Sequence, residues 1–344
     1  MKISIVFFGM NHDSLPFFDS LLENKDVDIC AVVTNRMDLH MDFILSKKGI
    51  KEKLRRFAKY MVRKPILGFI PNRKKKDSTT IESLARHRNI PIFDSALLNE
   101  QRIIKKLKNL DTDLFIVGYF NRILRKEIID IPREGTINIH PSLLPKYGGA
   151  DPFFWTIKNA EKESGVTIHF IDEKIDTGDI IYQKRLDIEK DWDSEMLKKR
   201  SEELAIQMLK EVKNLFLNKS FNITKQDLRK ATYYPPAGLE CRMIDWSLKA
   251  DAIMRLVRAC KAYRGAIAYL NGRRVRIFDC EPSCSSNYDI NTKPGEIVGL
   301  EDNWIIVRTV DSFIKVQAMI CESNSKLLFE EINQLHIGNR FKSL

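Results

Sequence analysis

The sequence predicts a doubly wound α/β domain with a mostly parallel sheet, followed by a smaller C-terminal β-rich barrel domain. Two observations predict the first domain: apolar runs alternate with stretches of helical spacing, and these runs end in polar residues. One observation predicts the second: toward the C-terminus, short β-branched runs separated by turn residues replace that alternation. At 344 residues, the chain has the length of two domains.

In the first domain, the predicted elements begin as strand, helix and strand. Residues 3–8 form an apolar run, residues 14–24 have helical spacing, and residues 27–34 are β-branched and apolar. Polar residues follow the first run directly, so it predicts a buried strand rather than a secretory leader. We expect further strands at 114–118 and 135–140 and further helices near 81–88 and 126–129. Parallel strands with crossover helices place a site beyond the carboxyl ends of the strands.

Residues 36–80 do not fit this alternation and are expected to form an insertion. The formal net charge of +11 is concentrated there, because the segment 47–76 has thirteen Lys or Arg and a single acid, Glu52. Apolar residues at helical spacing within this segment predict a basic amphipathic helix. A block of this kind favours a polyanionic partner, such as RNA or an anionic membrane surface, over the alternative of a solvated basic face.

The predicted domain organisation is a first domain at 1–217, a linker at 218–230 and a C-terminal domain at 231–344. Pro235 and Pro236 exclude a helix at the start of the last domain. A helix is expected at 250–260, and the short runs after it predict a small β-barrel. These runs are 266–270, 275–278, 296–299 and 304–310.

Composition excludes several classes of protein. Hydrophobic residues make up 44% of the chain and charged residues 30%, which is typical of a globular protein and not of a disordered or fibrous one. No apolar run is long enough to predict a membrane span. The six cysteines are scattered, and no His or Cys cluster completes a metal site around them. We therefore expect reduced thiols, no metal and a cytoplasmic location.

The stretch from 136 to 181 contains the residues best suited to chemistry. Asn138 and His140 are two apart on a predicted strand, so both project to the same side. Attack on a carbonyl needs a donor for the developing oxyanion and a base for the proton of the amine. Asp176, in a later loop, is suited to fix the tautomer of the imidazole. The alternative for Asn138 and His140 is capping and core polar packing, and packing is also the interpretation given to His169.

Four motifs follow one another in this stretch. They are Asn-x-His at 138–140, Ser-Leu-Leu-Pro at 142–145, Gly-Val-Thr-Ile at 165–168 and Asp-Thr-Gly-Asp at 176–179. In this order they resemble the signature of the 10-formyltetrahydrofolate-dependent formyltransferases. The resemblance covers most of the chain, and residues 244–246, 258–259 and 293–296 are similar to the C-terminal domain of the members that formylate initiator methionyl-tRNA. In those members this domain is a small β-barrel that helps to hold the tRNA.

The resemblance implies transfer of a formyl group from 10-formyltetrahydrofolate to a primary amine, without a metal. Carried over by position, the catalytic residues are Asn138, His140 and Asp176. Asn138 is then the donor to the formyl oxygen, Asp176 orients His140, and His140 either accepts the amine proton or stabilises the oxyanion. The folate is expected to contact the Ser-Leu-Leu-Pro loop and the turn after the strand at 114–118. The residues concerned are Ser142, Leu143, Leu144, Pro145, Tyr119, Ile123 and Leu124.

Two departures from the family concern the acceptor. After Leu-Leu-Pro the family has an aromatic residue and then Arg-Gly, whereas this chain has Tyr147-Gly148-Gly149. Residues 10–13 are Met-Asn-His-Asp, where the tRNA-specific members tend to have Thr-Pro-Asp-Phe. Both departures weaken the prediction of initiator methionyl-tRNA as the acceptor, but the basic segment and the C-terminal resemblance still favour it. The alternatives are a nucleotide-linked amino sugar for surface polysaccharide and an inactive, RNA-binding relative, which the intact catalytic residues argue against.

Overall fold

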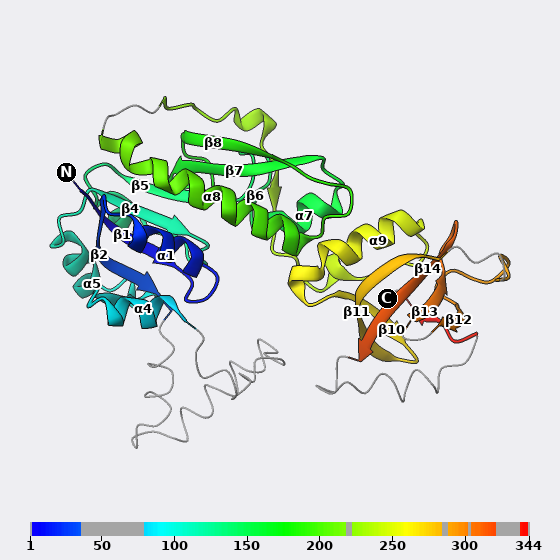
Figure 1. The fold of residues 1–344 in the computed structure, drawn as a ribbon. Coiled ribbons are helices and arrows are strands. Elements are labelled where there is room, and N and C mark those ends of the chain that lie inside the picture. The colour runs from blue at the N-terminus through cyan, green and yellow to red at the C-terminus, as the bar shows by residue number, and fades with distance from the viewer. Residues whose placement is uncertain are drawn as a thin grey trace, which may run out of the picture. The chain divides into compact units, whose positions relative to one another are not determined.

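The computed structural model of the chain describes residues 2–35, 79–217, 222–283, 288–301, 304–320 and 338–342 (Figure 1). The chain divides into two compact units. The first comprises Met1–His140, Ile168–Tyr182 and Ala205–Lys225, and the second comprises Pro141–Thr167, Gln183–Leu204 and Gln226–Leu344. The basic segment 47–76 and most of the predicted insertion at 36–80 lie outside the described residues.

A seven-stranded sheet in the order β3-β2-β1-β4-β5-β7-β8 organises the N-terminal part of the described chain. The pairings β1–β2, β1–β4, β2–β3 and β4–β5 are parallel, and the strand order reverses at β1, as a doubly wound sheet requires. The strands are β1 (Ile3–Gly9), β2 (Val27–Thr34), β3 (Ile92–Asp94), β4 (Leu114–Gly118), β5 (Thr136–His140), β7 (Glu163–Phe170) and β8 (Ile180–Asp187).

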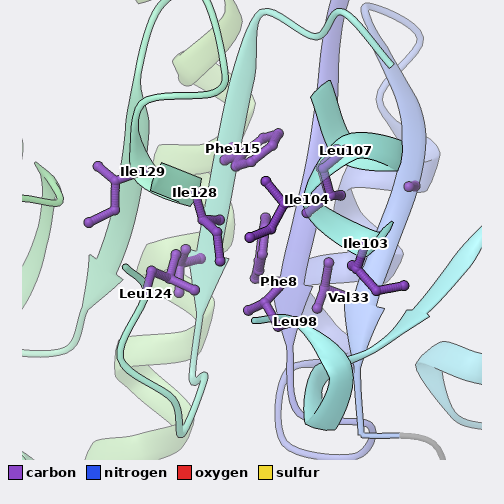
Figure 2. Packing of buried hydrophobic residues seen from close by; sticks show 13 residues of the cluster. Phe8, Val33, Leu98, Ile103, Ile104, Leu107, Phe115, Leu124, Ile128 and Ile129 are labelled. Carbon is purple, nitrogen blue, oxygen red and sulfur yellow. The ribbon is translucent and has the colours of Figure 1, made fainter. Parts of the chain in front are cut away.

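Alternate residues of β1 face two different helical layers. Val6 and Phe8 belong to a core cluster with residues of α5 (Gln101–Lys108) and α6 (Lys126–Ile129), and Figure 2 shows Phe8 within it. Phe7 instead meets Phe18 of α1 (Leu15–Glu23), with ring centroids 5.7 Å apart. Because successive side chains point to opposite faces, a strand covered by helices on both sides must be apolar throughout. This is why β1 reads as a continuous apolar run.

Local signals in the sequence start two of the helices. Thr80 begins α4 (Ile81–His87) with a capping box, in which its side chain accepts from the backbone N–H of Ser83 and the Ser83 side chain accepts from that of Thr80. Pro16 lies in the first turn of α1, where its missing N–H costs nothing. The remaining α-helices of the described chain are α7 (Pro152–Lys158), α8 (Ser194–Leu217) and α9 (Ala250–Ala259).

The second sheet has six strands in the described residues, in the order β12-β13-β14-β11-β10-β15. Neighbouring strands pair antiparallel, and backbone bonds join the two ends of the sheet. Phe341 N donates to Gly295 O at 2.8 Å, and Ile297 N donates to Asn339 O at 2.8 Å, so the sheet closes as a barrel. Its strands are β10 (Ala266–Leu270), β11 (Arg273–Ser283), β12 (Ile297–Glu301), β13 (Trp304–Arg308), β14 (Phe313–Ile320) and β15 (Phe341–Lys342).

The predicted fold class is confirmed for both parts of the chain. Most predicted strands and helices agree with the observed elements to within one or two residues, whereas β3, α5, β8, α8, β14 and β15 were not predicted. The predicted domain boundaries at 217/218 and 230/231 stay a prediction. Among the described helices, none combines the length and the apolar character that a bilayer span needs.

Candidate active site

The carboxyl ends of three adjacent parallel strands lie at one edge of the first sheet. β1 ends at Gly9, β4 at Gly118 and β5 at His140, and the register pairs Gly9 with Gly118 and Gly118 with Ile139. The loops after these strands therefore begin side by side. In a doubly wound sheet this edge is where ligand sites form. Asn138 and His140 both lie in the C-terminal half of β5, so the topology of the sheet brings them to this edge.

Asp176 comes from a tight turn between β7 and β8. The turn is closed by a hydrogen bond from Phe170 N to Asp179 O at 2.9 Å. It requires glycine at 178, because a Cβ on Gly178 would lie 1.9 Å from the carbonyl oxygen of Phe170. Asp176 itself has a φ of 55°, a left-handed conformation that Asp adopts more readily than most residues. The Asp-Thr-Gly-Asp motif thus specifies the turn that presents Asp176.

The Asp176 carboxylate lies between two imidazoles. Its Oδ2 is 3.6 Å from Nδ1 of His140, and its Oδ1 is 3.6 Å from Nε2 of His169. Only 6% of the His140 side chain, 2% of that of His169 and 11% of that of Asp176 are exposed, so water screens these charges weakly. An imidazole nitrogen that faces a carboxylate keeps its proton there, which leaves Nε2 as the basic nitrogen of His140. This arrangement suits a general base.

His169 lies at the site, although its sequence context suggested packing alone. Its Nδ1 is 2.7 Å from the carbonyl oxygen of Phe170, which can only accept, so Nδ1 carries a proton. Its Nε2 lies 3.3 Å from the side-chain nitrogen of Asn138 and 3.6 Å from Oδ1 of Asp176. The sequence signal for this role is the alternation in β7: Val166 and Ile168 face the core, whereas Thr167 and His169 form a second, polar face that is also buried.

The amide nitrogen of Asn138 donates to Asp176 and contacts His169. It lies 3.3 Å from Nε2 of His169 and 3.4 Å from Oδ1 of Asp176. Both distances exceed the roughly 2.9 Å of an ordinary N–H···O bond, and catalytic hydrogen bonds often tighten only when the reactants bind. Asn138 is therefore held in orientation by weak bonds that an oxyanion can replace. The structure brings together the three predicted residues and adds His169, while their catalytic roles stay predictions.

The Leu-Leu-Pro loop, residues 142–151, belongs to the second unit and is shaped by a buried hydroxyl. Thr167 Oγ1 donates to Ser142 O at 2.6 Å and accepts from Leu144 N at 3.2 Å. Gln183 Nε2 donates to the same hydroxyl at 2.8 Å and to Leu144 O at 2.9 Å. Thr167 thus fixes the backbone of the predicted folate loop from one side.

The four residues of this loop that are predicted to contact the folate have side chains with different roles. Ser142 Oγ donates to Lys146 O at 2.8 Å, and the Leu144 side chain is buried, so both serve the shape of the loop. Leu143 and Pro145 are partly exposed. We therefore expect Leu143 and Pro145 to offer side-chain contact to a ligand, and Ser142 and Leu144 to offer backbone atoms.

The turn after β4 contains the other three predicted folate residues. Tyr119 has a φ of 50°, and its ring lies 5.0 Å from that of Phe17. Ile123 is 74% exposed, whereas Leu124 is buried in the same core cluster as Phe8 (Figure 2). Ile123 is thus available for apolar contact with a ligand. Leu124 fixes the turn to the core, and only its backbone is left for such a contact.

Asn11 organises the loop after β1. It is 2% exposed, and its side-chain oxygen accepts from Glu82 N at 2.9 Å. Its backbone oxygen accepts from Ile81 N at 3.1 Å, and its N–H donates to Asn35 Oδ1 at 2.9 Å. Asn11 therefore joins the end of β2 to the start of α4.

Within the part of the chain that the structure describes, no three His, Cys, Asp or Glu side chains are arranged to hold a metal ion. The side chains that meet at the site are one amide, two imidazoles and one carboxylate. Such a set can stabilise an oxyanion and accept a proton from an attacking amine.

Comparison with known proteins agrees with this chemistry. Residues 1–212 match the model of the formyl transferase family, and residues 239–335 match that of the formyl transferase C-terminal domain. A methionyl-tRNA formyltransferase of Thermotoga neapolitana is 30% identical over 293 residues, which cover 83% of this chain and 92% of that protein. One of Caldicellulosiruptor saccharolyticus is 34% identical over 233 residues, covering 67% and 73%.

Solved structures share the fold at lower identity. The sugar 3N-formyltransferase WlaRD has a TM-score of 0.60 and 22% identity, and the match covers 93% of this chain and 98% of that one. An N-formyltransferase of Helicobacter canadensis has a TM-score of 0.59 and 19% identity, with coverages of 93% and 100%. With two family models matching most of its length and relatives at 30% identity, this chain belongs to the formyl transferase family.

Proposed function

We propose that the chain transfers the formyl group of 10-formyltetrahydrofolate to the amino group of initiator methionyl-tRNA. The observation that carries the chemistry is the contact of Asp176 with Asn138 and His140 in a buried site. The curated relatives support the acceptor, since those of Thermotoga and Caldicellulosiruptor are both methionyl-tRNA formyltransferases. A cytoplasmic location follows from this choice of acceptor.

In the proposed mechanism, each residue acts on one atom of the reactants. As the amine nitrogen attacks the formyl carbon, Nδ2 of Asn138 donates to the formyl oxygen, which becomes negative. Nε2 of His140 accepts the proton that the amine loses, and Asp176 stabilises the imidazolium that results. The bond between the formyl carbon and N10 of the folate then breaks, and the proton passes from His140 to N10. The products are the N-formyl amine and tetrahydrofolate.

The charge of the chain supports a nucleic acid as the acceptor. The net charge is +11, and thirteen of the basic residues fall in the segment 47–76. Each phosphate that a basic side chain neutralises releases counterions, so a polyanion gains more from this segment than a nucleotide with about two charges. The match to the family's C-terminal domain at 239–335 is in keeping with a large acceptor.

A nucleotide-linked amino sugar is the second candidate acceptor. The observation that favours it is Gly148, which stands where the family has an arginine after Leu-Leu-Pro. The amine chemistry at Asn138, His140 and Asp176 is the same for both acceptors, so only the acceptor side of the reaction separates them.

Incubation of the purified chain with 10-formyltetrahydrofolate and each acceptor tests the proposal. One arm contains charged initiator methionyl-tRNA, and the other contains a panel of nucleotide-linked amino sugars, with products identified by mass spectrometry. His140→Ala is the control, because it removes the proposed base. We expect formyl-methionyl-tRNA from the wild type only. A formylated sugar as the sole product would replace tRNA by the second candidate, and no product in either arm would identify an inactive relative.

A further inference from the structure

Residues 232–237, which we call the strap, lie along the backbone of the Leu-Leu-Pro loop. The strap falls in the stretch 213–238, which neither family match includes. Its short strand β9 (Tyr233–Tyr234) pairs in parallel with β6 (Gly148–Gly149) of the loop. The bonds between strap and loop are Thr232 N to Pro145 O (3.2 Å), Tyr147 N to Thr232 Oγ1 (2.9 Å), Gly148 N to Thr232 O (2.9 Å), Ala150 N to Tyr234 O (3.0 Å) and Ala237 N to Asp151 Oδ2 (2.7 Å).

Tyr234 of the strap stacks on two aromatic rings beside the loop. Its centroid is 5.0 Å from that of Tyr147 at an interplanar angle of 13°, and 4.9 Å from that of Trp155 at 26°. Asn159 Nδ2 donates to the hydroxyls of Tyr147 and Tyr234, at 3.1 Å and 2.9 Å. Burial raises the pKa of Tyr147 well above its ordinary value, so its hydroxyl remains a donor to Glu161 Oε1 at 2.7 Å.

The two glycines of the loop make room for the strap. A Cβ on Gly149, whose φ is 93°, would lie 2.4 Å from the carbonyl oxygen of Tyr234. A Cβ on Gly148 would lie 3.2 Å from the ring of Tyr233, so an arginine at 148 would force that ring to move. Glycine at 148 and 149 and the strap therefore belong to one packing arrangement.

The strap and the Thr167 hydroxyl hold the same loop at different points. Thr167 bonds the backbone of Ser142 and Leu144, and the strap bonds the backbone from Pro145 to Ala150. The strap also belongs to the same unit of the chain as the loop, so this clamp is built within one compact body. The strap thus supplies four backbone-mediated bonds to the loop between Pro145 and Ala150, in addition to the internal bond from Ser142 to Lys146.

We infer that the strap holds the Leu-Leu-Pro loop in the shape that binds the folate co-substrate, with Tyr234 as the positioning residue. This inference rests on the proposed function, in which the loop contacts the folate. When a loop adopts its binding shape for only a fraction of the time, the apparent affinity falls by that fraction. Loss of two stacked ring pairs is enough to reduce the competent fraction to about one tenth.

Calorimetric titration of the full chain with 5-formyltetrahydrofolate, a stable analogue of the co-substrate, tests this role. We expect Tyr234→Ala to weaken binding about tenfold or more, and Tyr234→Phe, which keeps both stacks, to weaken it less than about threefold. The matched control is Tyr233→Ala, which removes the neighbouring ring and leaves the stacks; it should bind within about threefold of the wild type. In turnover, Tyr234→Ala should raise the KM for 10-formyltetrahydrofolate while the KM for the acceptor and kcat stay unchanged.

Three results would overturn the inference: wild-type affinity in Tyr234→Ala, equal losses in Tyr234→Ala and Tyr233→Ala, or a fall in kcat without a rise in the folate KM. If Tyr234→Ala fails to melt cooperatively, Asn159→Ala decides instead, because it removes the bonds to both hydroxyls and leaves the rings. Asn159→Ala should weaken folate binding severalfold, and wild-type affinity there refutes the role of the strap. Failure of the wild type to bind the analogue contradicts the proposed function itself.

Discussion

Replacement of Asp176 by Asn tests whether the charge of this residue drives the chemistry. Asn has nearly the same shape and accepts a left-handed backbone, so the turn at φ 55° should survive the exchange. What is lost is a negative charge that lies 3.6 Å from Nδ1 of His140 and 3.6 Å from Nε2 of His169. The substitution therefore separates the electrostatic role of Asp176 from its place in the turn.

The distance sets the size of the expected effect. A carboxylate 3.6 Å from an imidazole stabilises the imidazolium by about 4 to 5 kcal/mol at an effective dielectric constant of about 20. At a more screened effective dielectric constant of about 30, the same distance still gives about 3 kcal/mol. Such a loss in the transition state lowers kcat on the order of 100-fold.

Initial rates at saturating 10-formyltetrahydrofolate and acceptor measure this effect directly. Glu173→Gln is the matched control: Glu173 is on the same turn, its side chain is 69% exposed, and its nearest cation is Lys126 Nζ at 3.8 Å. We expect Glu173→Gln to have the wild-type kcat and Asp176→Asn to lose about two orders of magnitude, with folate binding retained in both. An Asp176→Asn enzyme within about fivefold of the wild type would refute the electrostatic role.

Two further predictions concern the frame of the site and the thiols. Thr167→Val leaves Leu144 N, Ser142 O and Gln183 Nε2 without their shared hydroxyl. It should therefore lower the free energy of unfolding, measured in urea, by about 2 to 4 kcal/mol, whereas Thr167→Ser, which keeps the hydroxyl, should lower it by less than about 1 kcal/mol. Equal stabilities of the two variants would contradict this prediction. Burial raises the pKa of Cys260 and of Cys280 to about 12, so at pH 8 the thiolate fraction of each is about a thousandth of that of an ordinary thiol. Iodoacetamide should therefore modify the buried Cys260 only after denaturation and the half-buried Cys280 far more slowly than an ordinary thiol, which peptide mass spectrometry detects. Rapid modification of either thiol in the native chain would contradict this prediction.

Local patterns in the sequence were enough to predict four adjacent strands of the sheet, β2, β1, β4 and β5, and the three central residues of the site. β1 and β4 are covered by helices on both faces, so their sequences are apolar runs. In β5, the alternation of side chains along a strand is enough to place Asn138 and His140 on the same face. α8 was missed because its buried stripe includes Ser201 and Ala205 next to Leu197, which weakens the apolar period.

Features that depend on distant partners could not be predicted. The pairing of Gly148 with Tyr233 joins residues 85 positions apart, and neither short strand has a periodicity of its own. His169 was taken as a packing residue because a single histidine on a strand usually packs in the core or against a neighbouring strand, whereas here its Nε2 faces the buried carboxylate of Asp176. Tertiary context decided both cases.

The hydrogen bonds of Asn11 bear on how far the segment between β2 and α4 can vary in length. Asn35 and Ile81 both bond to Asn11, so the chain ends on either side of residues 36–78 are fixed close together, whatever sequence joins them. The entropy of closing a loop grows only by about 0.6 kcal/mol for each doubling of its length. Exchange of these 43 positions for a connector of about five residues therefore changes the closure term by only about 2 kcal/mol. In evolutionary terms, the join at Asn11 is a place where a segment can be gained, lost or exchanged while the parallel sheet behind it stays the same.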